Sequence, residues 1–214
     1  MNSLALQILP RVKRERNSMY VRHEVVTPGI VIQRIAAGEG SVRVFLYTEA
    51  LGLVTALAKS AREERSKLRA HLQVGTHGTF ALVRGRDTWR ITGATGTSNV
   101  LFTHAHSASG REAAARVFQA VRQFVHGAVP DQYLWESLSG FIAALGACAE
   151  RGNARVLEYL AVLRLLASLG YVREDAAIMP FLAVSYEPDI VARAEAARAT
   201  LVKAVNEAIS ASGL

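Results

Sequence analysis

Hydrophobic and polar positions alternate along the first part of the chain. Between Val42 and Leu46, aliphatic residues alternate with Arg43 and Phe45, a period of two that is typical of a strand with one buried face. Similar alternation, or runs rich in β-branched residues bounded by glycine and proline, predicts five strands in all. These strands cover residues 25–34, 42–47, 53–58, 74–83 and 88–92.

A segment with a different period separates the third and fourth of these strands. Ala61, Leu68 and Leu72 are spaced as one stripe of a helix, which predicts a helix over residues 61–72. Five short strands with a helix between the third and the fourth have the element order of an OB-fold, a small β-barrel.

The second half of the chain has helical periodicity throughout. It follows a connection rich in Gly, Ser, Thr and His at residues 93–109. The pattern predicts helices over residues 111–126, 131–150, 154–169 and 189–211, and Gly127 and Gly170 stand where glycine ends a helix. We therefore expect an α+β protein, in which a five-stranded OB-fold β-barrel is followed by a helical bundle. The expected division is an N-terminal extension over residues 1–24, the barrel over 25–100 and the helices over 101–214.

The composition is that of a globular protein rather than a disordered or membrane-spanning one. Of the 214 residues, 50% are hydrophobic and 20% are charged. No stretch holds the roughly 18 apolar residues that a membrane-spanning helix needs. The single cysteine, Cys148, excludes an internal disulfide and a cysteine zinc cluster. These features predict a cytoplasmic protein with no membrane partner.

Positive charge is concentrated in the first half of the chain. The formal net charge is +7, and residues 1–104 carry 15 Lys and Arg against 7 Asp and Glu, whereas residues 105–214 carry 10 against 11. This asymmetry indicates that the barrel half binds a polyanion. The predicted nucleic-acid-binding residues, on strand ends, the connecting helix and the last turn of the barrel, are Arg34, Lys59, Arg62, Arg65, Lys67, Arg69, Arg84, Arg86 and Arg90.

Three aromatic residues of the barrel are candidate stacking platforms for nucleic-acid bases. Phe45, Tyr47 and Trp89 lie on predicted strands beside these cations. The competing interpretation is that they fill the barrel. That interpretation is favoured for Trp89, and it is open for the face that Phe45 and Tyr47 share with Arg43. In the N-terminal extension, a cluster of basic residues between Arg11 and Arg16 is either a second phosphate-binding arm or, as we favour, a loose tail.

Motifs for catalysis and for metal binding are missing. The chain has no glycine-rich phosphate loop of the GxxxxGK[ST] type and no context for a Ser-His-Asp or Cys-His nucleophile. His104 and His106 are close in sequence but lack further ligands, so we expect a solvated loop there. Glu63 and Glu64 are expected to pair with neighbouring arginines. We therefore predict no enzyme activity and no metal or other cofactor.

The ordered motifs of the first half resemble the N-terminal domain of the bacterial RecO family. They read GIVIQR (29–34), GEG (38–40), LYTEALGLVTALAKSAR (46–62), SKLRAHLQ (66–73) and WRIT (89–92), and LRLLASLGY (163–171) is similar to a helix end of the same family. Two departures stand out: Gly40-Ser41 replaces the usual Ala-Asp, and Ser60 replaces the usual glycine of the basic loop.

The resemblance implies a recombination mediator that works in DNA repair. Such a protein binds single- and double-stranded DNA, anneals complementary strands, and helps load recombinase together with a RecR-like partner. It also contacts the C-terminal tail of single-stranded-DNA-binding protein through its helical half. The resemblance further implies a nucleoid-associated location in the cytoplasm.

The family's four-cysteine zinc site has no counterpart in this sequence. Residues 172–180 read VREDAAIMP, so this chain resembles the members that lack zinc. We expect Met179, Phe181 and Leu182 to hold this segment by apolar contacts instead. Two rival functions of other classes remain, a protein-interaction adaptor whose barrel no longer binds DNA and an RNA-binding OB-fold protein.

Overall fold

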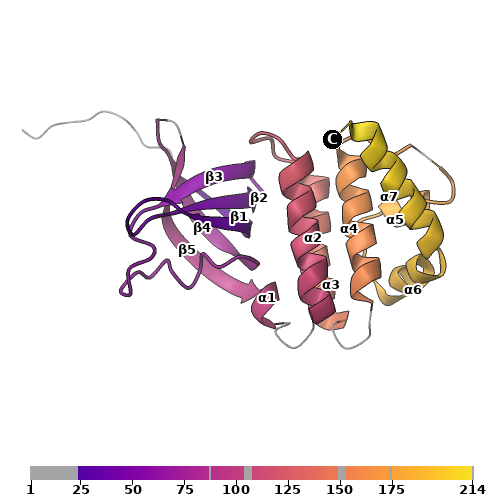
Figure 1. Cartoon of the computed structure of the whole chain (residues 1–214), viewed down its shortest axis with the longest axis horizontal. Coiled ribbons are helices and arrows are strands. Elements are labelled where there is room, and N and C mark those ends of the chain that lie inside the picture. Colours follow the sequence, from indigo (N-terminus) through magenta and orange to yellow (C-terminus); the bar gives the residue numbers. More distant parts are fainter. Residues whose placement is uncertain (1–23, 87, 104–107, 149–152, 174, 214) are drawn as a thin grey trace, which may run out of the picture.

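The computed structural model describes residues 24–86, 88–103, 108–148, 153–173 and 175–213. A β-barrel occupies one end of the molecule and a bundle of helices the other (Figure 1). The predicted N-terminal extension lies almost wholly outside the described residues, as do His104, His106 and the side chain of Cys148.

Five strands form a closed barrel in the order β1-β2-β3-β5-β4. They are β1 (Glu24–Ala36), β2 (Val42–Thr48), β3 (Gly52–Ala58), β4 (Thr76–Arg84) and β5 (Trp89–Asn99). All neighbours are antiparallel except β3 and β5, which close the barrel through a short parallel pairing. The predicted OB-fold barrel is confirmed, because this order, with β1 shared between β2 and β4, is that of an OB-fold.

Alternating residues of the strands fill the barrel. Val42, Val44 and Leu46 point inward with Phe80 and Leu82, and each of them is at most 1% exposed. The opposite face of β2 carries Arg43, Phe45 and Tyr47, as the period of two predicts. β5 continues to Asn99, so the predicted loop at residues 93–109 begins as a strand.

The connection from β3 to β4 is not the predicted helix over residues 61–72. It is a series of turns, whose backbone hydrogen bonds link residues three apart, for example from the Glu63 amide to the Ser60 carbonyl oxygen. The apolar stripe is nevertheless the buried one, since Ala61 and Leu72 are fully buried and Leu68 packs beside them. Three apolar contacts in twelve residues supply too little packing to stabilise so short a helix.

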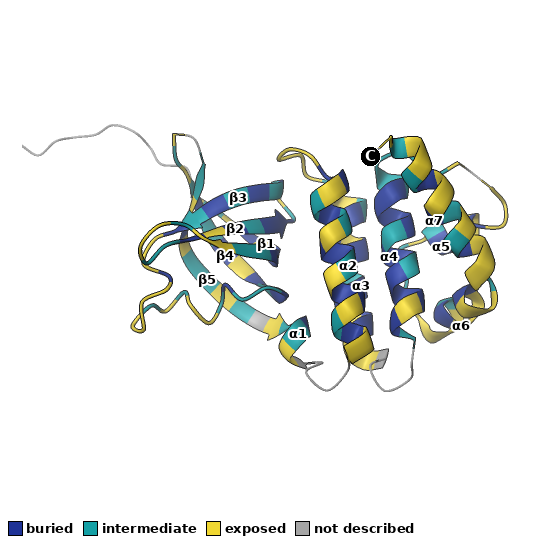
Figure 2. Cartoon of the chain, in the orientation of Figure 1, coloured by how far each residue is buried: buried dark blue, intermediate teal, exposed yellow. Residues whose placement is uncertain are grey.

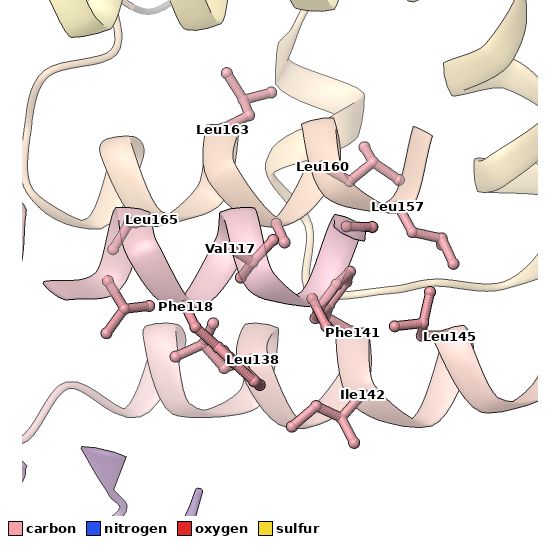
Figure 3. Close-up of a cluster of buried hydrophobic side chains, with 14 of the residues drawn as sticks. Val117, Phe118, Leu138, Phe141, Ile142, Leu145, Leu157, Leu160, Leu163 and Leu165 are labelled. Atoms are coloured by element: carbon pink, nitrogen blue, oxygen red, sulfur yellow. The ribbon is translucent and has the colours of Figure 1, made fainter. Parts of the chain in front are cut away.

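The helical part surrounds one central helix. Its elements are α1 (Val100–Thr103), α2 (Ala108–Phe124), α3 (Gln132–Cys148), α4 (Ala154–Ser168), α5 (Met179–Leu182), α6 (Pro188–Ala196) and α7 (Arg198–Ser212). α4 packs against α2, α3 and α7, and Figure 3 shows the side chains of α2, α3 and α4 that meet in this core. The predicted helix over residues 189–211 is broken at Ala197, which caps both α6 and α7.

α4 ends as the sequence predicts. Gly170 has a φ of 79°. The Tyr171 amide donates to the carbonyl oxygen of Leu166, and the Gly170 amide donates to that of Ala167, both at 2.9 Å. This pair of bonds is the Schellman arrangement, for which glycine is favoured.

A buried arginine holds the segment that follows α4. The Arg164 side chain is fully buried, and it donates from Nε to the Phe181 carbonyl oxygen at 2.8 Å and from Nη2 to that of Ser185 at 2.7 Å. Phe181 is buried as expected, but Met179 is 50% exposed, so its predicted role is wrong. Polar contacts of Arg164 therefore add to the apolar ones in fixing this segment.

The barrel and the helices share a core. Ile30, Ile32 and Tyr47, on the outer face of the barrel, belong to the same apolar cluster as the helices. The rings of His77 and Trp135 meet edge to face at 5.7 Å between centroids. This interface covers one side of the barrel, and it leaves most of the β3–β4 connection and the β4–β5 turn uncovered by the helices (Figure 1).

Candidate nucleic-acid interface

The β3–β4 connection presents a row of cations to solvent. Lys59, Arg62, Arg65, Lys67 and Arg69 are all exposed, and Figure 2 shows this connection as a largely exposed segment at the barrel end farthest from the helices. The buried Ala61 and Leu72 anchor it to the barrel, so its charged side chains point outward.

The start of this connection is fixed by the neighbouring turn between β1 and β2. The Arg62 amide donates to the Gly40 carbonyl oxygen at 2.8 Å. Ser60, between Lys59 and Arg62, has a φ of 52° and is the only non-glycine residue with a positive φ in the described parts of the chain. The family's usual glycine at this position therefore corresponds to a real conformational requirement.

The β4–β5 hairpin carries three further cations. Arg90 pairs in register with Leu57, and the Thr88 hydroxyl donates to the Thr55 carbonyl oxygen at 2.8 Å, so the turn lies along the outside of β3. Arg86 and Arg90 are exposed. The Arg84 guanidinium lies 5.2 Å from the centroid of the Trp89 ring, so this arginine is partly engaged within its own hairpin.

Arg34 differs from the other predicted cations. It lies on β1, is half-buried, and donates from Nη1 to Oε1 of Gln73 at 3.3 Å. Its first role is to tie β1 to the end of the β3–β4 connection. The structure thus exposes the cations of two loops of the barrel and places Arg34 at the end of the β3–β4 connection.

The cations of the barrel have no carboxylate partners among the described residues. All salt bridges among the described residues lie in the helices, including Arg116 with Glu158 at 2.7 Å and Arg198 with Glu195 at 3.3 Å. The expected pairing of Glu63 and Glu64 with the arginines beside them is therefore wrong. Unpaired, hydrated cations remain free to replace the counterions of a phosphate chain.

Arg43 is a candidate that the predicted set omits. It is exposed on the outer face of β2 and pairs in register with Leu57 of β3, which pairs in turn with Arg90 of β5. The β2–β3 face is the one with which OB-folds bind oligonucleotides. The signal was present in the sequence, since Arg43 stands at an outward position between Val42 and Val44.

The candidate stacking residues have different environments. Tyr47 is fully buried against the helices, where burial raises the pKa of its hydroxyl, so it is no platform. Phe45 is half-buried, and the Arg122 guanidinium from α2 lies 4.2 Å from its ring centroid. Trp89 packs on the barrel core, as favoured above.

The described residues contain neither a metal-binding cluster nor a membrane-spanning helix. Among the described residues, no group of three His, Cys, Asp or Glu side chains is placed to hold a metal ion. No helix described here is both long enough and apolar enough to cross a membrane.

A closed five-stranded barrel of OB order, with unpaired cations on its loops, defines a candidate nucleic-acid-binding OB-fold protein. Residues 21–100 match the family described as "Recombination protein O N terminal". The barrel domain, which is less than half of the chain, is therefore similar to the N-terminal domain of the RecO family.

Individual relatives match about a third of the chain. A DNA repair protein RecO from Dehalococcoides mccartyi strain CBDB1 is 35% identical over 72 residues, which are 34% of this chain and 28% of the relative. One from Acetivibrio thermocellus is 34% identical over 65 residues, 30% of this chain and 26% of the relative. The match thus spans less than a third of each relative's length.

Proposed function

We propose that this protein is a DNA-binding mediator of recombination and repair. The observation that carries the proposal is the set of exposed cations, without carboxylate partners among the described residues, on the loops of an OB barrel that matches the N-terminal domain of the RecO family. The two curated relatives are named DNA repair proteins, which supports the same role.

Binding would follow from the charge arrangement rather than from any catalytic group. The cations of the β3–β4 connection and of the β4–β5 turn contact phosphates of single- or double-stranded DNA and release the condensed counterions. Two complementary strands repel each other until such cations lower their charge. The same surface therefore favours annealing, without any turnover chemistry.

The partners of the proposed function are assigned to different parts of the molecule. DNA binds the barrel end. A RecR-like partner assists the loading of recombinase, and the helical half contacts the tail of single-stranded-DNA-binding protein. The helical half suits protein contacts, since residues 105–214 are near neutral and several of their cations are already paired.

The test is the salt dependence of DNA binding by a triple variant, Arg62→Ala, Arg65→Ala and Arg69→Ala. Removing one phosphate contact lowers the log–log slope for a single strand by about 0.7, so the slope should fall by about 2 units. Affinity should fall alike for all sequences. The matched control is Arg193→Ala, Arg198→Ala and Lys203→Ala, which removes the same charge from exposed positions in the helices.

The rivals give distinct results in this assay. An adaptor shows little binding of wild-type protein to any strand, and an RNA-binding protein prefers RNA over DNA of the same length. Equal slopes for the triple variant and wild type, with both proteins folded, contradict the proposed role of the β3–β4 connection.

A further inference from the structure

A groove lies where the barrel meets α2. It encloses about 420 Å³ and is lined by β1, the end of the β3–β4 connection, α1 and α2. Ile32 and Phe118 are its buried apolar residues, whereas Ala115, Gln119 and Gln123 are exposed along it. None of the cations predicted from the sequence lines this groove.

A β-bulge turns β1 toward the groove. The register of β1 with β2 shifts between Val31 and Gln33, so that Ile32 and Gln33 both lie outside the barrel. Bulges of this kind commonly re-aim side chains beside functional sites. Here the bulge places an aliphatic side chain and an amide next to each other on the groove wall.

The Gln33 amide has an unsatisfied oxygen. Its Oε1 is buried and accepts no hydrogen bond in the structure. A buried polar atom without a partner is costly, so a ligand that donates a hydrogen bond there gains affinity. The terminal torsion of a glutamine amide is soft, so a small rotation presents this oxygen to a donor in the groove.

Arg122 joins the groove to the outer face of the barrel. It lines the groove from α2, and its guanidinium stacks on Phe45, the cross-strand partner of Gln33. Phe45 stands two residues from the exposed Arg43 on the same face of β2. A DNA strand that runs along the cations of the outer barrel face therefore reaches Arg122 and the groove without leaving the protein surface.

We propose that this groove holds one unstacked base of single-stranded DNA. Every base offers an N–H donor for the Gln33 oxygen and a flat apolar face for Ile32 and Phe118, while Arg122 lies beside the adjoining phosphate. The groove is therefore a base-binding subsite at the barrel–helix junction, and the helical half takes part in it. This inference rests on the proposed function and adds base contacts to its phosphate contacts.

The experiment compares two strands of equal charge and of about 16 nucleotides, one of thymidylate and one wholly abasic. Wild-type protein should bind the thymidylate strand at least about fivefold more tightly, since base contacts in a protein site are worth that much or more. Gln33→Leu removes the acceptor and Ala115→Phe fills the groove from its exposed side. Both variants should lose this preference while binding the abasic strand like wild type.

Two measurements separate a base contact from a structural effect. Gln33→Leu replaces an amide whose oxygen is buried and unsatisfied by an apolar group of similar size, so the melting temperature of the variant should equal or exceed that of wild type. Arg122→Ala should weaken binding of both strands, and the thymidylate strand more. Its matched control is Arg198→Ala, another arginine near an aromatic ring, at 6.0 Å from Tyr159, which should change neither affinity.

Each outcome decides between the two proposals. If the variants of the groove keep the wild-type preference while the triple variant of the β3–β4 connection loses affinity, the groove subsite is overturned and the proposed function stands. If wild-type protein binds neither strand, both are overturned. If an acidic peptide binds wild type but not Gln33→Leu or Ala115→Phe, and the two strands bind equally, the groove takes a protein and the proposal is overturned.

Discussion

The barrel and the helical bundle use the same kind of side chain in opposite ways. Residues 24–99 and 100–213 each contain ten Lys and Arg. In the helices, Arg116, Arg155, Arg198 and Lys203 pair with carboxylates, and Arg164 is buried on carbonyl oxygens. In the described part of the barrel, the cations pair with no carboxylate, and most are exposed. Arginine content therefore says less about function than whether each arginine has a partner inside the fold.

The largest expected effect comes from removing the one fully buried cation. Arg164→Ala leaves the carbonyl oxygens of Phe181 and Ser185 without their charged donor, and it opens a cavity under the Tyr186 ring, whose centroid is 4.4 Å from the guanidinium. We expect the free energy of unfolding to fall by about 3 kcal/mol or more. Urea denaturation measures it.

The comparison also predicts what this variant does not change. Arg164 lies in the helical half, so folded Arg164→Ala should bind DNA with the wild-type salt slope. Arg155→Ala is the control on the same helix, an exposed arginine 3.7 Å from Glu158, with an expected loss below about 1 kcal/mol. A comparable loss in both variants would mean that the burial of Arg164 does not increase its contribution to the free energy of unfolding.

A smaller effect is expected at the contact between the two regions. Gly52 begins β3 with a φ of 66°, and a Cβ there would lie 2.1 Å from the Val129 carbonyl oxygen of the α2–α3 loop. Gly52→Ala should therefore destabilise the protein by about 2 kcal/mol or more, through strain and through displacement of that loop. Thermal unfolding compares it with wild type.

Gly38→Ala is the matched control for this contact. Gly38 has a similar φ of 68°, but a Cβ there would meet no atom within 4 Å. It should cost only the backbone strain, about 1 kcal/mol. Equal losses at the two positions would show that the loop at Val129 yields freely and that the barrel and helices are not firmly packed there.

The sequence predicted the barrel better than it predicted its loops. Alternation in β2 identified the buried face because a strand has one side chain per face every two residues. It could not distinguish a face open to DNA from one covered by helices, so Tyr47 was a candidate platform and is buried instead. The turns at residues 61–72 were missed because their apolar spacing also fits a helix.

The helical half contained a signal that sequence reasoning can use. α4 carries apolar residues around most of its circumference, which predicts a largely buried helix, and an arginine in the middle of such a helix needs internal partners. Arg164 could have been identified on this ground. The groove at Gln33 could not, because it depends on a bulge in β1 and on where α2 packs.

Acid should loosen the contact between the two regions through His77. Burial against Trp135 lowers the pKa of this imidazole below its usual 6.5. The folded state therefore binds fewer protons than the unfolded state, and stability decreases as the pH falls from about 6.5 toward the lowered pKa. His77→Phe keeps an aromatic ring and should reduce this dependence. The measurement is the melting temperature between pH 7.5 and 5, and parallel curves for the two proteins would contradict the role of His77.

The smallest expected effect is a gain in stability within the proposed DNA surface. Ser60 adopts a φ of 52°, in a region that costs a residue with a Cβ about 1 kcal/mol. Ser60→Gly should therefore raise the free energy of unfolding by about 0.5 kcal/mol, after the added flexibility of the unfolded chain is subtracted. Ser66→Gly, in the same connection but without a positive φ, should lower the free energy of unfolding.

Ser60→Gly leaves the neighbouring Lys59 and Arg62 in place, so the variant should also keep the wild-type salt slope for DNA. A stabilised variant with an altered slope would contradict this expectation. It would mean that the strained backbone at residue 60 positions the neighbouring cations for DNA.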